Sequence, residues 1–227
     1  MNYEMICFWA FLIVWLVILL ITYHKMTPKG DLKANDITFH ALIIGLIVVM
    51  GFVPEAGYLS IFPGISFSLI HLPVLIGAYK KGWKGGLLYG IAFGFTSWIQ
   101  ALMSGTGFNA FFIYPWVSIL PRAIFGIFSG FVFDLLRKNP KLYKNVFVIG
   151  GFSFLLTITH TVLVFADLFI FFTDTMMGLF ISNEPAAEGV AFTFVGVIAL
   201  GMLGEAILAS ILTPAVSKAL AKVQRSK

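Results

Sequence analysis

Long apolar runs alternate with short polar or aromatic connections along the whole chain. Seven of these runs approach or exceed the length that a membrane-crossing helix needs, which is about 20 apolar residues. They cover residues 5–23, 37–53, 66–80, 85–104, 115–136, 145–172 and 190–221. The pattern predicts an all-α integral membrane protein with seven spans. We interpret the first run as a retained helix, because Glu4 stands where a signal peptide carries basic residues.

The composition supports this interpretation. Hydrophobic residues make up 59% of the 227 residues, charged residues 11%, and the mean hydropathy is +0.97, which is typical of a membrane protein and excludes a soluble domain. The lone cysteine, Cys7, excludes a disulfide within the chain and a thiolate metal cluster.

The charges predict the orientation. Of the 15 basic residues, all except Arg122 fall in connections on the same side of this topology: Lys25, Lys29, Lys33, Lys80, Lys81, Lys84, Arg137, Lys138, Lys141, Lys144, Lys218, Lys222, Arg225 and Lys227. The opposite connections, 54–65, 105–114 and 173–189, carry acidic residues and no basic ones. By the positive-inside rule we expect a multi-pass protein of the cell membrane with its basic loops and C-terminus in the cytoplasm. The first two opposite connections are rich in Gly, Pro and aromatic residues, so we expect them to form a lid.

Arg122 is the basic residue that breaks this rule. It lies within the apolar run 115–136, where a cation normally needs a partner. Pro121 cannot donate to the carbonyl of Val117, which leaves that acceptor at the same depth. Gly126 and Gly130 share its helical face, so Arg122 should point into the protein. Two interpretations stay open: Arg122 pairs with Asp167 or Glu205 to lock helices together, or it receives an anionic group of a ligand.

The other polar residues of the spans are few. His160 and Asp167 fall on one helical face with Thr157. Glu205 lies between small residues of the last run, and His71 precedes Pro73. For each histidine the alternative is a satisfied core residue. We list as candidate substrate-binding residues Arg122, Asn109, Tyr114, Trp116, His71, His160 and Glu205.

Three of these candidates would line the rim of an outward-opening site. Asn109 and the aromatic pair Tyr114 and Trp116 lie just before or at the start of the fifth run. An interfacial aromatic belt is the alternative for Tyr114 and Trp116. Glycines at residues 86, 90 and 94 predict close helix packing.

Enzyme signatures are missing. The chain has no G-x-x-x-x-G-K-[ST], H-E-x-x-H or G-x-S-x-G motif, so we expect neither an ATPase nor a common hydrolase, and we expect no metal or other cofactor. An intramembrane hydrolase using His71, His160, Asp167 and Glu205 is a rival hypothesis, which these absences disfavour. A stand-alone secondary transporter is another, although no inverted repeat is evident.

From about residue 36 to 221 the chain resembles the substrate-binding S components of energy-coupling factor (ECF) vitamin transporters. The resemblance is carried by GYLSIFPGISFSLIHLPVLIGAYKKGWKGGLLYGIAFGFTSW and by PWVSILPRAIFGIFSG, whose order and spacing are closest to the pantothenate-type branch. It implies a six-helix membrane protein that captures one vitamin at its outer side. It also implies partners, a T component and two cytoplasmic ATPases, so that the whole assembly is an ABC importer.

The resemblance also implies a docking surface and a domain division. The family docks through a small-residue A-x-x-x-A pattern, matched here by Ala41 and Gly45. We expect residues 1–36 to form an extra N-terminal helix with its basic linker, and 37–227 the six-helix substrate-binding domain. Pantothenate is the first ligand hypothesis, since Arg122 suits a carboxylate; pyridoxine, pyridoxamine and hydroxymethylpyrimidine are the alternatives.

Overall fold

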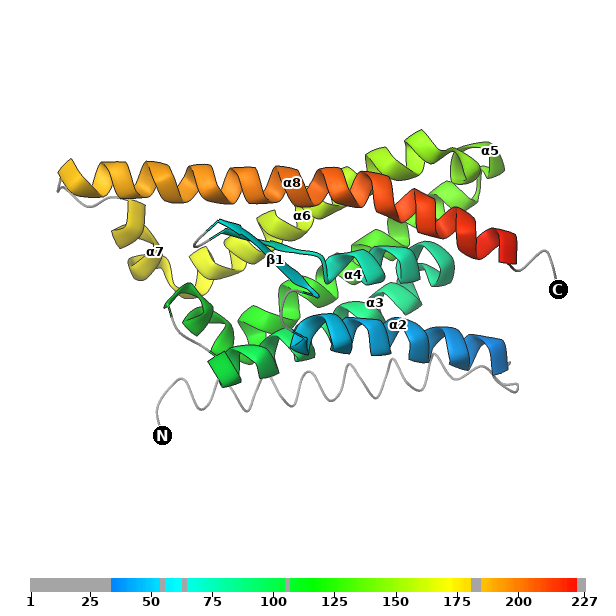
Figure 1. Cartoon of the computed structure of the whole chain (residues 1–227), viewed down its shortest axis with the longest axis horizontal. Helices are drawn as coiled ribbons and strands as arrows, with labels where there is room; N and C mark the ends of the chain where they lie inside the picture. Colours follow the sequence, from blue (N-terminus) through cyan, green and yellow to red (C-terminus); the bar gives the residue numbers. More distant parts are fainter. Residues whose placement is uncertain (1–33, 54–55, 63–64, 105–106, 181–184, 224–227) are drawn as a thin grey trace. The chain divides into compact units, whose positions relative to one another are not determined.

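A computed structural model describes residues 34–53, 56–62, 65–104, 107–180 and 185–223. The chain divides into two compact units, Met1–Leu42 and Ile43–Lys227. The first predicted span, 5–23, lies outside the described residues. The elements, labelled in Figure 1, are α2 (Ala34–Phe52), β1 (Tyr58–Phe62), β2 (Ile65–Ser68), α3 (His71–Ser104), η1 (Gly107–Ile113), α4 (Pro115–Arg137), α5 (Pro140–Lys144), α6 (Val146–Phe171), α7 (Thr173–Phe180) and α8 (Pro185–Val223).

Five of the described helices are long and apolar enough to cross a membrane. They are Ala34–Phe52, His71–Met103, Pro115–Arg137, Val146–Phe171 and Ile198–Leu220. Large apolar side chains such as Met103, Phe147 and Ile170 are strongly exposed on these helices, as side chains facing lipid are. The prediction of a mainly helical membrane protein is therefore confirmed, and α4 and α6 match their predicted bounds within one residue.

Helix α3 reverses its direction at Gly82, which adopts φ 68° and ψ −160°. A Cβ added to Gly77 would meet the Tyr89 ring, and one added to Gly86 would lie 3.4 Å from the Cβ of Ala78. In a straight helix Gly77 and Tyr89 would be about 18 Å apart. The ribbon therefore folds back (Figure 1), giving a first arm, His71–Lys81, and a second arm, Trp83–Ser104.

The prediction of a helical span over 66–80 was wrong in its first part. Residues 65–68 form β2, which pairs antiparallel with β1 in the register Tyr58↔Ser68 and Ser60↔Ser66. The Leu69 N–H closes the base of this hairpin by donating to Gly57 C=O at 2.7 Å. The helix begins only at His71, so its first arm is about 16 Å long, roughly half of a hydrocarbon core.

Helices α3 and α4 pack through their glycines. A Cβ added to Gly86 would meet the backbone of Gly126, and one added to Gly90 would meet the backbone of Arg122. The predicted packing role of the stripe at 86, 90 and 94 is confirmed, because each of these glycines touches α4. This close approach brings the second arm of α3 directly against the turn of α4 that carries Arg122.

Candidate substrate site

Arg122 is buried, with 6% of its surface exposed, one residue after the proline inside α4. Its Nη1 donates to the carbonyls of Val117 at 3.0 Å and Ser118 at 2.9 Å. Val117 C=O is the acceptor that Pro121 leaves without its helical N–H. The proline thus supplies an acceptor, and the arginine side chain folds back to use it.

Aromatic rings surround the guanidinium. Its Cζ lies 5.3 Å from the centroid of Phe93, on the second arm of α3, and 4.9 Å from that of Phe112, on η1. Ring faces carry negative partial charge, so both rings stabilise the cation where water is scarce. Arg122 is thereby held between α3 and η1.

His160 and His71 lie next to this arginine. Their rings stack at 6.1 Å with an interplanar angle of 21°, and His160 also contacts Phe93 at 5.5 Å and Phe125 at 4.9 Å. Both histidines are buried. Within the described part of the chain, neither ring nitrogen of His160 has a hydrogen-bond partner. A buried polar group in this state requires a partner from outside the chain, which is what a ligand or ordered water provides.

The inward stripe predicted for the sixth run is present on α6. Ser153, Thr157, His160, Val164 and Asp167 are all buried. Asp167 lies close enough to Arg122 for their charges to interact, and so does His160. The structure therefore brings Arg122, His160, His71 and Asp167 together from α3, α4 and α6.

Glu205 has a different neighbour. Its Oε1 accepts a hydrogen bond from the Ser68 N–H at 2.6 Å, and so α8 is joined to the end of strand β2. A carboxylate on a backbone N–H forms a strong, charge-assisted bond. The recorded contact of Glu205 thus fixes the hairpin to α8.

The rim candidates lie around the start of α4. Tyr114 and Trp116 pack against the buried cluster of Val117, Val164, Leu168 and Met176, and their rings are 5.1 Å apart. Tyr114 also contacts Phe172 at 5.2 Å. Both side chains are half-buried, whereas Asn109 on η1 is exposed. Packing among α4, α6 and α7 accounts for Tyr114 and Trp116 more directly than an interfacial belt does.

Reasoning from the sequence missed the phenylalanines of the site. Phe93, Phe112 and Phe125 touch Arg122 or His160 but are apolar residues in apolar surroundings. A signal existed for Phe93, which lies seven residues after Gly86 and so shares its helical face toward α4. In the described residues, no three His, Cys, Asp or Glu side chains come together as a metal site.

Known proteins resemble this chain over most of its length. Residues 35–217 match the family described as ECF transporter, substrate-specific component. The pantothenic acid transporter PanT of Lactococcus lactis subsp. cremoris (strain MG1363) is 28% identical over 209 residues, which covers 86% of this chain and 97% of that protein. The matched region contains α2 through most of α8 and therefore every residue of the site described above.

Proposed function

The chain belongs to the family of ECF transporter substrate-specific components, and on that premise we propose that it captures pantothenate for import. The observation that carries the ligand assignment is the similarity to the pantothenic acid transporter PanT, which extends over nearly the whole of both chains. The buried Arg122 supports it, because pantothenate carries a carboxylate and a guanidinium binds carboxylates in a planar, two-bonded geometry.

We propose an orientation for the bound vitamin. The carboxylate lies at Arg122, and the amide and hydroxyl groups lie toward His160 and His71. Phe93 supports this arrangement because its ring contacts both Arg122 and His160, so one extended ligand can reach both ends along it. Asn109, Tyr114, Trp116 and Glu205 complete the site at its rim and beside the hairpin. Asp167 balances the charge of Arg122 before the ligand enters.

The helices support a six-helix core. Counting the two arms of α3 separately, α2, both arms, α4, α6 and α8 make six helical segments within the described residues. We propose that this core lies in the cell membrane with its basic connections in the cytoplasm, following the positive-inside rule. On the α2 surface, Ala41 and Gly45 are exposed one turn apart, and we assign them to docking on the T component.

The proposed partners are a T component and two cytoplasmic ATPases, because the sequence contains no P-loop to harvest ATP itself. Uptake of radiolabelled pantothenate into cells tests this directly. Uptake should require the chain together with the T component and both ATPases. Ion-driven uptake by the chain alone would instead support the alternative of a stand-alone secondary transporter.

Another vitamin is the second candidate ligand. Pyridoxine, pyridoxamine and hydroxymethylpyrimidine are rings with hydroxyl groups, and the stacked pair of His71 and His160 with Phe93 and Phe125 offers ring contacts. These compounds carry no carboxylate, which leaves Arg122 without a role in binding them. Pantothenate uses both parts of the site.

A further inference from the structure

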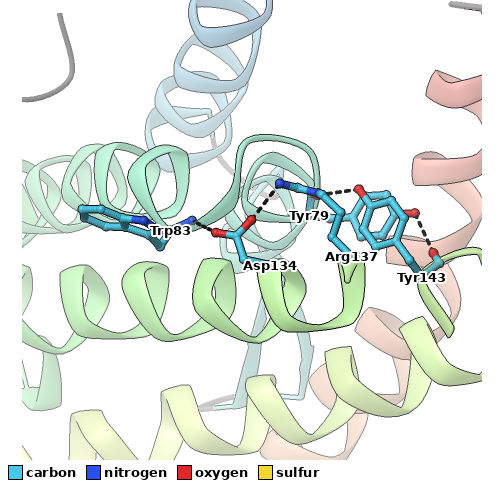
Figure 2. Close-up of polar contacts among 5 residues, drawn as sticks. All are labelled: Tyr79, Trp83, Asp134, Arg137 and Tyr143. Carbon is cyan, nitrogen blue, oxygen red and sulfur yellow. Dashed lines mark hydrogen bonds and ion pairs between the residues drawn. The ribbon is translucent and has the colours of Figure 1, made fainter. Parts of the chain in front are cut away.

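Four side chains surround the reversal of α3: Tyr79, Asp134, Arg137 and Tyr143. We call them the turn clamp. Figure 2 shows that they come from the first arm of α3, the last turns of α4, and α5. They lie at the end of the helices opposite to the His71 end of the first arm, and none belongs to the substrate site.

Two clamp residues cap the two helix ends that meet at Gly82. The Asp134 carboxylate accepts the Trp83 N–H at 2.9 Å, at the start of the second arm, and Arg137 Nη2 donates to Tyr79 C=O at 2.7 Å, near the end of the first (Figure 2). An anion at a helix start and a cation at a helix end each complement the helix dipole. Arg137 Nη1 also bonds to Asp134 Oδ1 at 2.7 Å.

The tyrosines add a second connection. Tyr143 Oη donates to Tyr79 C=O, and Tyr79 Oη donates to Tyr143 C=O, each at 2.9 Å. Their rings stack at 4.4 Å and 9°, and the Arg137 guanidinium lies 5.4 Å from the Tyr143 ring centroid. The Tyr79 carbonyl therefore receives two donors, one from α4 and one from α5.

The ion pair by itself contributes little to stability. The side chains of Arg137 and Asp134 are 40% and 29% exposed, and pairs at such exposure are weak. What the clamp does is geometric: it fixes the end of an arm only eleven residues long. Tyr79 follows His71 by eight residues, about 12 Å along a stiff helix. A shift of the clamped end therefore moves His71 against His160.

We propose that Asp134, Arg137 and Tyr143 are positioning residues that hold His71 in the geometry that the ligand requires. The proposal rests on the proposed function to the extent that His71 is taken as a ligand contact. It assigns a binding role to residues at the far end of the first arm, where chain analysis by charge alone finds only topological punctuation.

The first test measures pantothenate binding to the purified full chain. Arg137→Met removes both arginine bonds, and we expect Kd to rise roughly three- to tenfold, the effect of a lost hydrogen bond or two. Arg137→Lys keeps a cation that can donate to the Tyr79 carbonyl and should restore part of the affinity. Thr159→Val is the matched control, because it removes a bond to the Leu155 carbonyl on an exposed face of α6 and should leave Kd unchanged.

A double-mutant cycle separates positioning from general destabilisation. In a His71→Ala background, Arg137→Met should no longer raise Kd, because the residue that it displaces has been removed. In a Trp116→Phe background the cost of Arg137→Met should remain in full. If Arg137→Met lowers only the melting temperature and leaves Kd unchanged, the clamp is merely structural and the inference is overturned.

Amide hydrogen exchange of the ligand-free protein tests the inference without any vitamin. In Arg137→Met, exchange should accelerate along the whole first arm, including residues 71–78. Acceleration confined to residues 79–84 would overturn the proposal. If the wild-type chain binds no pantothenate, the proposed function fails while this exchange measurement still decides the role of the clamp.

Discussion

Arg122 is a cation within a membrane helix, and the local backbone explains how the chain tolerates it. Inserting an arginine at the centre of a membrane helix costs about 2.5–3.5 kcal/mol on insertion scales. Here Nη1 bonds to two carbonyls, one of them left without its helical partner by Pro121, and two aromatic rings flank the guanidinium. These contacts offset part of the cost before any ligand binds, so a binding role does not require the residue to sustain the fold as well.

We expect Arg122→Ala to weaken pantothenate binding roughly 100-fold or more, because it removes the buried partner of the ligand carboxylate. Expression and folding should persist. The measurement is calorimetric titration with pantothenate and with panthenol, an analogue that carries an alcohol in place of the carboxylate. The wild type should prefer pantothenate strongly and the variant should lose that preference. Loss of the folded protein would show instead that Arg122 is a structural partner of Asp167.

His160 is buried among aromatic rings, and its nitrogens meet no hydrogen-bond partner in the described residues. A residue selected only for packing would be better replaced by an apolar ring. We infer that the imidazole is kept for the ligand, at the expense of the stability of the empty protein.

His160→Phe tests this inference because it keeps a ring and removes both nitrogens. Pantothenate binding should weaken roughly three- to tenfold, the effect of losing a neutral hydrogen bond. The melting temperature of the ligand-free protein should stay unchanged or rise. An unchanged Kd with a lowered melting temperature would assign His160 to the core instead.

At the scale of elements, the reversal of α3 was predictable and the length of its first arm was not. The cluster of Lys80, Lys81 and Lys84 with glycines indicates a connection at an interface, and the chain does reverse there. Residues 58–68 are as apolar as a membrane helix, so their pairing into a hairpin has no signature in hydrophobicity alone. The same limit hid the phenylalanines of the site, since apolar residues announce no function in an apolar chain.

We expect Gly82→Ala to destabilise the protein by roughly 1–3 kcal/mol. Gly82 has φ 68°, and a Cβ there would meet the Asp134 carboxylate. Gly151→Ala is the matched control, because an added Cβ on that face of α6 meets nothing within 4 Å. Thermal unfolding in detergent should show a clear loss for Gly82→Ala and little change for Gly151→Ala. Equal melting temperatures would contradict the account of the reversal.

At the scale of the whole molecule, the sequence predicted the membrane class, most spans and the family, because hydropathy and charge act over long segments. It identified Arg122, His160 and His71 as candidates, since polar residues stand out in such a chain, and the structure brings all three together. It did not predict their contacts, which depend on how α3 folds back against α4. Whether residues 1–36 and 37–227 are separate domains stays a prediction.

The central claim is that this chain alone, without ATP, binds one vitamin and that the vitamin is pantothenate. Equilibrium binding of a panel to the purified protein tests it most directly, with pantothenate, pyridoxine, pyridoxamine, riboflavin, thiamine and a hydroxymethylpyrimidine as ligands. We predict tight one-to-one binding of pantothenate and none of comparable strength for the others. Tight binding of another vitamin would contradict the ligand assignment, and no binding across the panel would contradict the proposed function itself.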